Sequence, residues 1–414
     1  MTKSFKLDIL NLDKRRTTLF LYSSFFALLF QSSFSFAIIV ISDQVTNSAG
    51  ITGLIFALSY IPQVILTLYG GTLADRVSKA NWLRVTQSLL SISPLLLIIG
   101  IKLDVSSFVV ILFISSLWYG TLQSFSNPTR LAMVPEVADK DKAENLMTSV
   151  VSVRFATMAI GPLIVGALFE YSSYILTLAF IGLFSFLSGQ LVPATRISIF
   201  ERRSLRENLR DLRVGLNRIR RSKVISQLVA ANLVVCFATT GTFSVLIPLH
   251  AKHFLGLEGL GRGMLLMPLG LGMMSGSIVS EHVLHFIRRG RLIAVLCPLP
   301  PFLFFCISFM DSLFICMLNI VVMGVVAGLT ISLATTSLQT SSTEQERGKV
   351  MAVNTLVLFG FSGLSGATVG LVAEIFNTTL TIQLSGLFGC ILGTFLINPN
   401  LSLSRYKVGP TRDF

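Results

Sequence analysis

Charged residues are scarce in this chain of 414 residues: they make up 13% of the sequence, whereas hydrophobic residues make up 52%. A soluble protein carries about 25% charged residues, because its water-facing surface needs them. This scarcity excludes a soluble multi-domain enzyme. The net charge of +13 has a simple origin in a membrane protein, since cytoplasmic loops accumulate Lys and Arg, so it predicts no nucleic-acid partner.

Cysteine and histidine are also rare. The five cysteines all fall in apolar segments and form no CxxC pair, so we interpret them as small core residues rather than disulfides or metal ligands. The four histidines form two pairs three residues apart, His250/His253 and His282/His285, and two ligands do not complete a zinc site. The sequence therefore predicts no metal and no cofactor.

Long apolar runs dominate the chain instead. A membrane-spanning helix needs about 20 apolar residues. The first run is too long for a signal peptide and has no small-residue cleavage site after it, so we keep it as a helix. The sequence predicts an all-α membrane protein of twelve transmembrane helices, over 17–41, 50–74, 83–103, 106–127, 146–170, 172–195, 224–249, 262–285, 291–310, 312–339, 350–374 and 379–397.

The basic residues indicate the orientation of these spans. With the N-terminus inside, 29 of the 33 Lys and Arg residues fall at the cytoplasmic side, which is the asymmetry of multi-pass membrane proteins. Lys102, Lys252 and Arg262 fall outside, and Arg154 falls within a span. We therefore expect both termini in the cytoplasm.

The chain also repeats itself at an offset of about 205 residues. The pairs Pro62/Pro268, Gly71/Gly276, Arg84/Arg289, Gly166/Gly370 and Glu170/Glu374 stand at equivalent places in the predicted spans. Such an offset indicates two pseudo-symmetric six-helix halves. The predicted organisation is a cytoplasmic N-terminus over 1–16, an N-terminal bundle over 17–195, a linker over 196–223, a C-terminal bundle over 224–397 and a cytoplasmic tail over 398–414.

The linker 196–223 holds ten Lys and Arg residues. Its apolar residues recur every three or four positions, which predicts a basic amphipathic helix. We expect it to lie on the inner leaflet against anionic headgroups, and a regulatory or docking role is the alternative. The stripe consists of Leu205, Leu209, Leu212, Leu216 and Ile219.

A short charged turn joins the second and third spans. It reads Gly71-x-Leu73-Ala74-Asp75-Arg76 and continues to Arg84. The motif resembles the loop 2–3 signature of the major facilitator superfamily, although Ser78 stands where that family usually has a second glycine. The resemblance implies the major facilitator fold and a transporter. It also implies a cytoplasmic gate made by Gly71, Asp75, Arg76 and Arg84, in which Asp75 caps the eleventh span.

The fifth span carries the run from Gly161-Pro162 to Gly166. It resembles the Gly-Pro motif of exporter and antiporter members of that superfamily. Proline frees a backbone carbonyl and glycines let a neighbouring helix pack closely, so such a helix can bend as a hinge when the halves move. The alternative is a packing kink without a role in transport.

Arg154 lies about eight residues into the same span. A charge at that depth is costly and should face a cavity or a partner. One interpretation is a cavity cation that binds acidic or polar substrate groups. The other is a structural ion pair with Glu136 or Asp139.

Polar residues at helical spacing are candidates for the wall of a substrate cavity. In the resembled family, spans one, four, seven and ten line the cavity. The alternative for each residue is hydrogen bonding between helices. With Arg154, the candidates are Gln31, Tyr119, Gln123, Asn127, Asn232 and Asn319.

Three stretches are most similar to bacterial efflux members related to the enterobactin exporter and macrolide efflux proteins. They are Asn127–Val137, Ile160-Gly161-Pro162 and Glu346–Met351. This resemblance implies a proton-driven exporter in the bacterial inner membrane, with a siderophore or a hydrophobic antibiotic as substrate. No acid falls in mid-membrane, which favours a neutral or anionic amphiphile and leaves the proton carrier unidentified.

Two other classes of function stay open at this point. An importer or lipid flippase can share the same fold. A membrane-embedded serine hydrolase could use Ser365, because Gly363-Leu364-Ser365-Gly366 matches the GxSG of intramembrane proteases. We expect a monomeric transporter of a small molecule rather than an enzyme.

Overall fold

The computed structural model describes residues 2–74, 78–138, 140–194, 205–283 and 289–396. Over these ranges the chain forms helices and no strand. The first helix begins at Thr2, so residues 2–16 of the predicted N-terminal segment continue into the first span as helix. The predicted tail 398–414 lies outside the described residues.

Seven helices precede the linker. The third predicted span consists of two of them, because the helix is interrupted at Ser91. Pro94 contributes to the interruption, since it has no N–H to donate to the carbonyl four residues earlier. The helices are α1 (Thr2–Thr46), α2 (Ala49–Ala74), α3 (Lys79–Leu90), α4 (Ile92–Gly100), α5 (Val105–Val137), α6 (Lys140–Tyr171) and α7 (Tyr174–Gln190).

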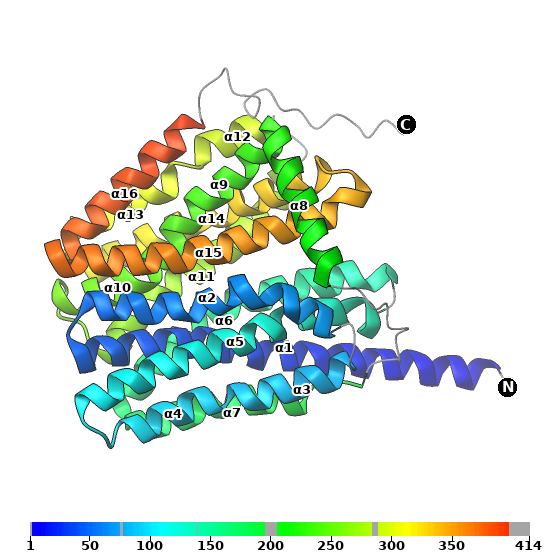
Figure 1. Ribbon diagram of the computed structural model, residues 1–414, viewed down its shortest axis with the longest axis horizontal. Coiled ribbons are helices and arrows are strands. Elements are labelled where there is room, and N and C mark those ends of the chain that lie inside the picture. Colours follow the sequence, from blue (N-terminus) through cyan, green and yellow to red (C-terminus); the bar gives the residue numbers. More distant parts are fainter. Residues whose placement is uncertain (1, 75–77, 139, 195–204, 284–288, 397–414) are drawn as a thin grey trace.

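The linker helix and eight further helices follow (Figure 1). The seventh span breaks at Thr240, whose φ of −116° and ψ of −88° are not helical, and the ninth breaks before Pro298. The helices are α8 (Leu205–Arg221), α9 (Lys223–Thr239), α10 (Gly241–His253), α11 (Gly259–Val283), α12 (Arg289–Leu296), α13 (Leu299–Ile307), α14 (Leu313–Thr340), α15 (Glu344–Phe376) and α16 (Thr378–Phe395).

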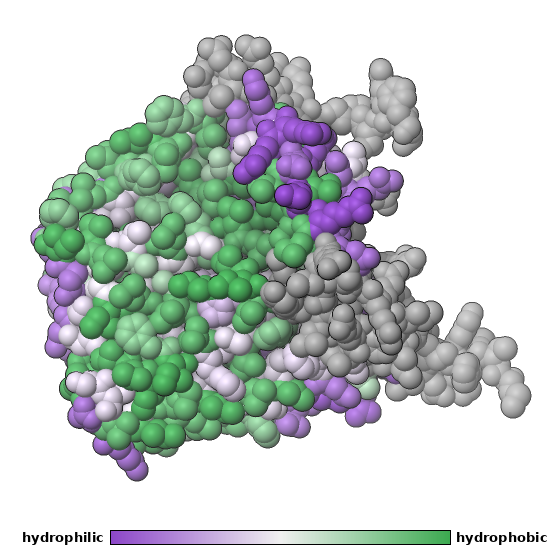
Figure 2. Space-filling view, in the orientation of Figure 1, coloured by the Kyte–Doolittle hydropathy of each residue, from purple (hydrophilic) through white to green (hydrophobic). Residues whose placement is uncertain are grey.

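Eleven helical stretches in the described ranges are long and apolar enough to cross a membrane. The remaining predicted span, α7, is apolar but has only 17 residues. Figure 2 shows hydrophobic residues over most of one face and hydrophilic residues gathered over α8 and at the edges. The predicted all-α membrane architecture is confirmed.

The packing of the helices repeats between the halves. Helix α2 packs on α5 as α11 packs on α14, and α4 packs on α7 as α13 packs on α16. The halves meet through two equivalent contacts, α2 with α15 and α6 with α11. Equivalent spans therefore occupy equivalent places, as the repeated offset predicts.

The apolar core differs between the two ends of the bundle. We call the end with α8 the inner end and the opposite end the outer end. The largest buried cluster contains Phe34 of α1 and Phe243 of α10, so both halves share it. Two smaller clusters, one around Phe20 and one around Leu333, each belong to a single half near the inner end. The halves thus share a core toward the outer end and separate toward the inner end.

Helix α8 lies against the inner end of α15. Leu212 and Ile219 pack into the C-terminal inner cluster, whereas Leu209 and Leu216 are exposed. A Cβ at Gly215 would come within 2.5 Å of the Lys349 carbonyl oxygen, so the two helices approach closely. The predicted lipid-facing stripe is therefore divided: part of it contacts protein. Ion pairs Lys349–Asp211 (2.8 Å) and Arg218–Glu346 (3.2 Å) flank this contact.

Candidate functional site

A cavity of about 330 Å³ lies between the halves. Its walls come from α1, α2 and α6 of one half and from α9, α10, α11, α14 and α15 of the other. Most lining side chains are apolar, and three of the predicted cavity residues, Gln31, Arg154 and Asn232, are among the polar ones. The cavity thus offers an apolar volume with a few polar anchors, as small-molecule sites do.

Arg154 is the cation of this cavity. Its side chain is exposed, and no carboxylate in the described part of the chain pairs with it. Glu136, one of its two proposed partners, pairs with Lys79 instead. Asp139, the other, lies outside the described residues. An exposed guanidinium in an apolar cavity can bind a carboxylate, sulfonate or phosphate group through two parallel hydrogen bonds.

Asn232 adds a hydrogen-bonding group to the wall formed by α9. Its Nδ2 donates to Asn354 Oδ1 at 3.5 Å, and its own Oδ1 is buried without a partner in the described structure. Thr239 and Thr240 line the cavity at the break between α9 and α10. A broken helix beside a cavity presents backbone groups that a continuous helix would satisfy internally.

Four predicted cavity residues do not line this cavity. Tyr119 is 3% exposed and lies 3.5 Å from Ser35 through their hydroxyls, and Gln123 is 2% exposed; both are buried. Asn127 and Asn319 are half-buried elsewhere on α5 and α14. Helical spacing correctly placed Tyr119 and Gln123 on one face of α5. That face packs against other helices of the N-terminal half instead of lining the cavity.

The predicted hinge residues make close contacts with other helices. Gly161 faces the Ser32 hydroxyl of α1, and the carbonyl of Pro162 faces Gly263 of α11. A Cβ at Gly166 would come within 2.6 Å of the Gly259 carbonyl oxygen. Helix α6 runs unbroken through Pro162, so tight packing is observed and bending stays a prediction.

The predicted cytoplasmic gate is only partly described. Gly71 lies in the last turns of α2, and Asp75 and Arg76 lie outside the described residues. Arg84 donates from Nε and Nη2 to the Val192 carbonyl oxygen, at 3.3 and 2.8 Å. That contact lies within the N-terminal half, so the gate stays a prediction.

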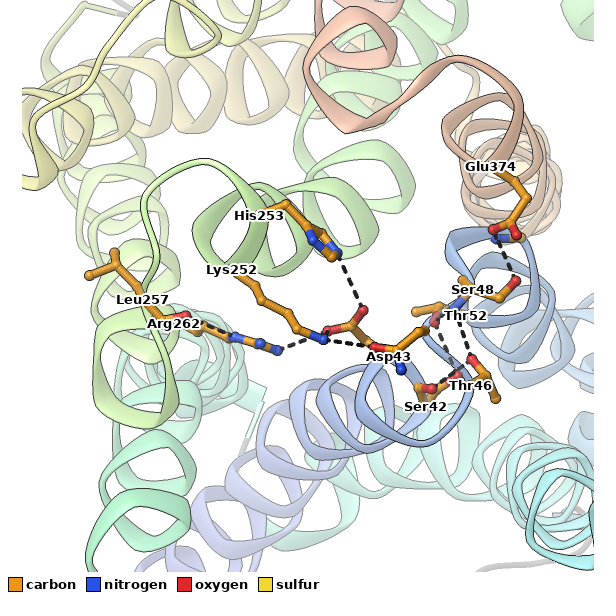
Figure 3. Close-up of polar contacts among 12 residues, drawn as sticks. Ser42, Asp43, Thr46, Ser48, Thr52, Lys252, His253, Leu257, Arg262 and Glu374 are labelled. Carbon is orange, nitrogen blue, oxygen red and sulfur yellow. Dashed lines mark hydrogen bonds and ion pairs between the residues drawn. The ribbon is translucent and has the colours of Figure 1, made fainter. Parts of the chain in front are cut away.

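The outer end holds a cluster of ion-paired residues that were not predicted to lie together. Asp43 of α1 accepts from Lys252 Nζ at 3.0 Å and from Arg262 Nη1 at 3.1 Å (Figure 3). His253 Nε2 lies 3.7 Å from its other oxygen. These four residues join α1 to α10 and α11, across the two halves. One signal in the sequence could have revealed it: Lys252 and Arg262 are basic residues on the outer side, whereas most Lys and Arg residues fall on the cytoplasmic side.

Two further carboxylates close the outer end in equivalent ways. Glu170 of α6 accepts from the Leu260 N–H at 2.8 Å, in the first turn of α11. Glu374 of α15 accepts from the Gly50 N–H at 3.0 Å, in the first turn of α2, and from the Ser48 hydroxyl (Figure 3). Each carboxylate therefore caps the N-terminus of a helix in the opposite half.

The proposed hydrolase serine makes an ordinary helical contact. The Ser365 hydroxyl donates to the Ser362 carbonyl oxygen at 3.0 Å, and its side chain is 3% exposed. A buried hydroxyl committed to its own helix is not activated as a nucleophile, which needs an adjacent base.

Comparisons with known proteins agree with this architecture. The model of the Major Facilitator Superfamily matches residues 20–367. No curated protein matches the chain. A bacterial homolog to the human lysosomal transporter Spinster, solved in an inward-facing and unoccupied conformation, is 14% identical with a TM-score of 0.70, over 94% of this chain and 97% of that one.

A mutant of the nucleoside transporter NupG is 11% identical with a TM-score of 0.71, over 92% of this chain and 98% of that one. Identities this low show a shared fold alone. The family match adds the class of protein, because it spans most of the chain. The chain therefore belongs to the major facilitator superfamily and is a multi-pass membrane transporter of a small molecule, not an enzyme.

Proposed function

We propose that this transporter exports a small anionic amphiphile by alternating access, driven by protons. The observation that carries the proposal is Arg154, an exposed guanidinium in a mostly apolar cavity between the halves. An apolar body would fill the cavity while an acidic group binds Arg154. The efflux resemblance of Asn127–Val137 and of Ile160-Gly161-Pro162 supports export, and a siderophore or a hydrophobic antibiotic fits this chemistry.

The described conformation fits the state in which an exporter loads its substrate from inside. The outer end is closed by ion pairs and helix caps between the halves, while each half keeps its own apolar cluster at the inner end. The Spinster homolog with a similar fold is described as inward-facing and unoccupied. Bending at Gly161 and Pro162, and closure by the loop around Asp75 and Arg76, would produce the opposite state.

We assign the transporter to the bacterial inner membrane as a monomer, with both termini and the basic helix α8 at the anionic cytoplasmic leaflet. The charge asymmetry supports this orientation. Reporter fusions after residues 215 and 405 should read cytoplasmic, and a fusion after residue 256 should read external. Exchanged signals at 215 and 256 would reverse the orientation.

Arg154→Lys and Arg154→Gln test the substrate role. A charge-assisted hydrogen bond contributes about 1.5–3 kcal/mol, so Arg154→Gln should raise the half-saturating substrate concentration roughly 10- to 100-fold. Lys keeps the charge but lacks the planar fork, so its effect should be smaller. The measurement is uptake of a catecholate siderophore or a macrolide into inverted vesicles, with the exposed loop variant Lys102→Gln as the matched control.

The same vesicles separate export from its alternatives. Uptake without ATP that collapses with a protonophore supports a proton-driven exporter. Accumulation only in right-side-out vesicles would make the protein an importer, and movement of labelled lipid would make it a flippase. Unchanged substrate affinity together with lowered thermal stability in Arg154→Gln would overturn the substrate role of this residue.

A further inference from the structure

The outer ion-pair cluster carries more positive than negative charge. Its single carboxylate, Asp43, faces the basic side chains of Arg262 and Lys252, and also His253 (Figure 3). Asp43 and Arg262 have side chains 2% and 1% exposed. The buried pair is therefore balanced, and the extra positive charge of the cluster lies on Lys252, whose side chain is 22% exposed and can be reached by another anion.

One nitrogen of this cluster has no acceptor. Arg262 donates from Nη1 to Asp43 and from Nε to the Leu257 carbonyl oxygen at 3.2 Å, while its Nη2 is buried without a partner in the described structure. Among the other acids of the outer end, Glu170 and Glu374 are already bonded to backbone N–H groups, and Glu258 is exposed. A buried guanidinium nitrogen without an acceptor is an incomplete anion-binding group.

The cluster lies directly beyond the cavity. Ile39 of α1 and Leu266 of α11 line the cavity wall. Asp43 and Arg262 each lie four residues further toward the outer end on the same helices, about 6 Å at the helical rise per residue. The cluster therefore lies at the outer end of the cavity, between Arg154 and the outer surface.

We propose that Arg262 and Lys252 form a second anion-binding site, which receives the acidic group of the substrate after Arg154. The acidic group replaces Asp43 on Arg262 and so loosens the ion pair that joins α1 to α10 and α11. This inference rests on the proposed anionic substrate. It explains how cargo opens the outer end, because a ligand shifts an equilibrium only when it binds one state better than the other.

The test compares two probes of similar shape, 2-naphthalenesulfonate and the uncharged 2-naphthylmethanol, binding to the purified full-length protein by calorimetry. The ratio of their affinities cancels any change in the balance of conformations, since both probes respond to it. Asp43→Asn removes the competing carboxylate and should raise the sulfonate preference about tenfold. Arg262→Gln removes the binding group and should lower it about tenfold.

Two further variants complete the design. Lys252→Gln, at a residue with a side chain 22% exposed, should lower the preference in the same direction as Arg262→Gln, and it stands in for that variant if the buried substitution impairs folding. Glu258→Gln removes an exposed carboxylate near the same end and should leave the preference unchanged.

A cluster that only holds the halves together predicts a different result. Asp43→Asn and Arg262→Gln would then break the same ion pair, and the affinity ratio would stay constant or change in the same direction in both. If Arg154→Gln removes the sulfonate preference but these two variants do not move it in opposite directions, the second site is refuted and the proposed substrate class survives. A wild-type protein without sulfonate preference would refute both.

Discussion

The outer and inner ends of this transporter are held by different kinds of contact. At the outer end, charges less than 3% exposed pair across the halves, and Gly53 meets Gly366 backbone to backbone. At the inner end of the described structure, Lys79 pairs with Glu136 within one half, and two ion pairs join α8 to α15 through side chains that are about one-third exposed. Removing one partner of a buried ion pair is strongly destabilising, because the other charge is left buried without a partner. An exposed ion pair contributes only about 0–1 kcal/mol to stability.

This difference indicates which end of the molecule is harder to open. Movement that separates the outer ends must break helix caps, a buried ion pair and glycine contacts together. Movement at the inner end meets two separate apolar clusters and a linker held by exposed charges. We therefore expect substitutions at the outer end to alter transport far more than substitutions around α8.

Gly53→Ala should have the largest effect. A Cβ at Gly53 would come within 2.5 Å of the Gly366 carbonyl oxygen and 2.8 Å of the Gly370 Cα, and backbone atoms cannot move aside as a flexible side chain can. Overpacking of this kind costs about 1–3 kcal/mol, so α2 and α15 should stay apart at the outer end. Transport should fall at least tenfold.

The measurement is labelling of an Ile39→Cys reporter by an impermeant thiol reagent from the outer side, in a protein whose five native cysteines are replaced by alanine. Ile39 is 1% exposed in the closed state. Gly50→Ala is the matched control, because its Cβ would lie 3.4 Å from the Leu371 side chain, an ordinary contact. Equal labelling of the two variants would contradict the backbone contact.

Glu170→Gln and Glu374→Gln should have intermediate and equal effects. Each removes a negative charge at a helix N-terminus of the opposite half, a contribution of about 0.3–1 kcal/mol, while leaving an oxygen that can accept the same hydrogen bond. Labelling of the Ile39→Cys reporter should rise by a similar factor in both. A wild-type rate in one variant alone would show that the two caps are not equivalent.

Lys349→Gln should have the smallest effect. Its partner Asp211 is 36% exposed, so loss of the ion pair should lower the midpoint of thermal unfolding only slightly. The difference from the wild type should be smaller still in high salt. Arg220→Gln, at an exposed position of the same helix α8, is the control. A loss of transport comparable to that of Gly53→Ala would mean that α8 restrains the inner end, and would break the comparison.

Much of the fold follows from features that repeat along the sequence. Apolar runs of spanning length predict the spans, and the offset between Glu170 and Glu374 predicts equivalent positions that turn out to hold equivalent caps. The break at Thr240 was not predicted, because the run Thr239-Thr240-Gly241-Thr242 lies inside a long apolar segment that was interpreted as one continuous span. The next residue, Gly241, packs against Ser362 and Ser365 of α15.

The site was predicted less completely than the fold. Arg154 could be found because a charge within an apolar run needs a special environment. Spacing also placed Tyr119 and Gln123 on a common face, but it carries no information on which neighbour that face meets. The Asp43 cluster joins residues 209 and 219 positions apart, so only the three-dimensional arrangement reveals it.

The exchanged helix caps have a consequence for the order in which the protein is made. The amide of Gly50 leaves the ribosome early, yet the carboxylate that satisfies it belongs to Glu374, near the end of the chain. Ser48 can accept from the Ile51 N–H as soon as α2 forms, but the Gly50 N–H has to wait for its carboxylate until the last spans are inserted. A chain that ends before Glu374 would keep this N–H without its carboxylate, so the last spans complete a contact at the start of α2.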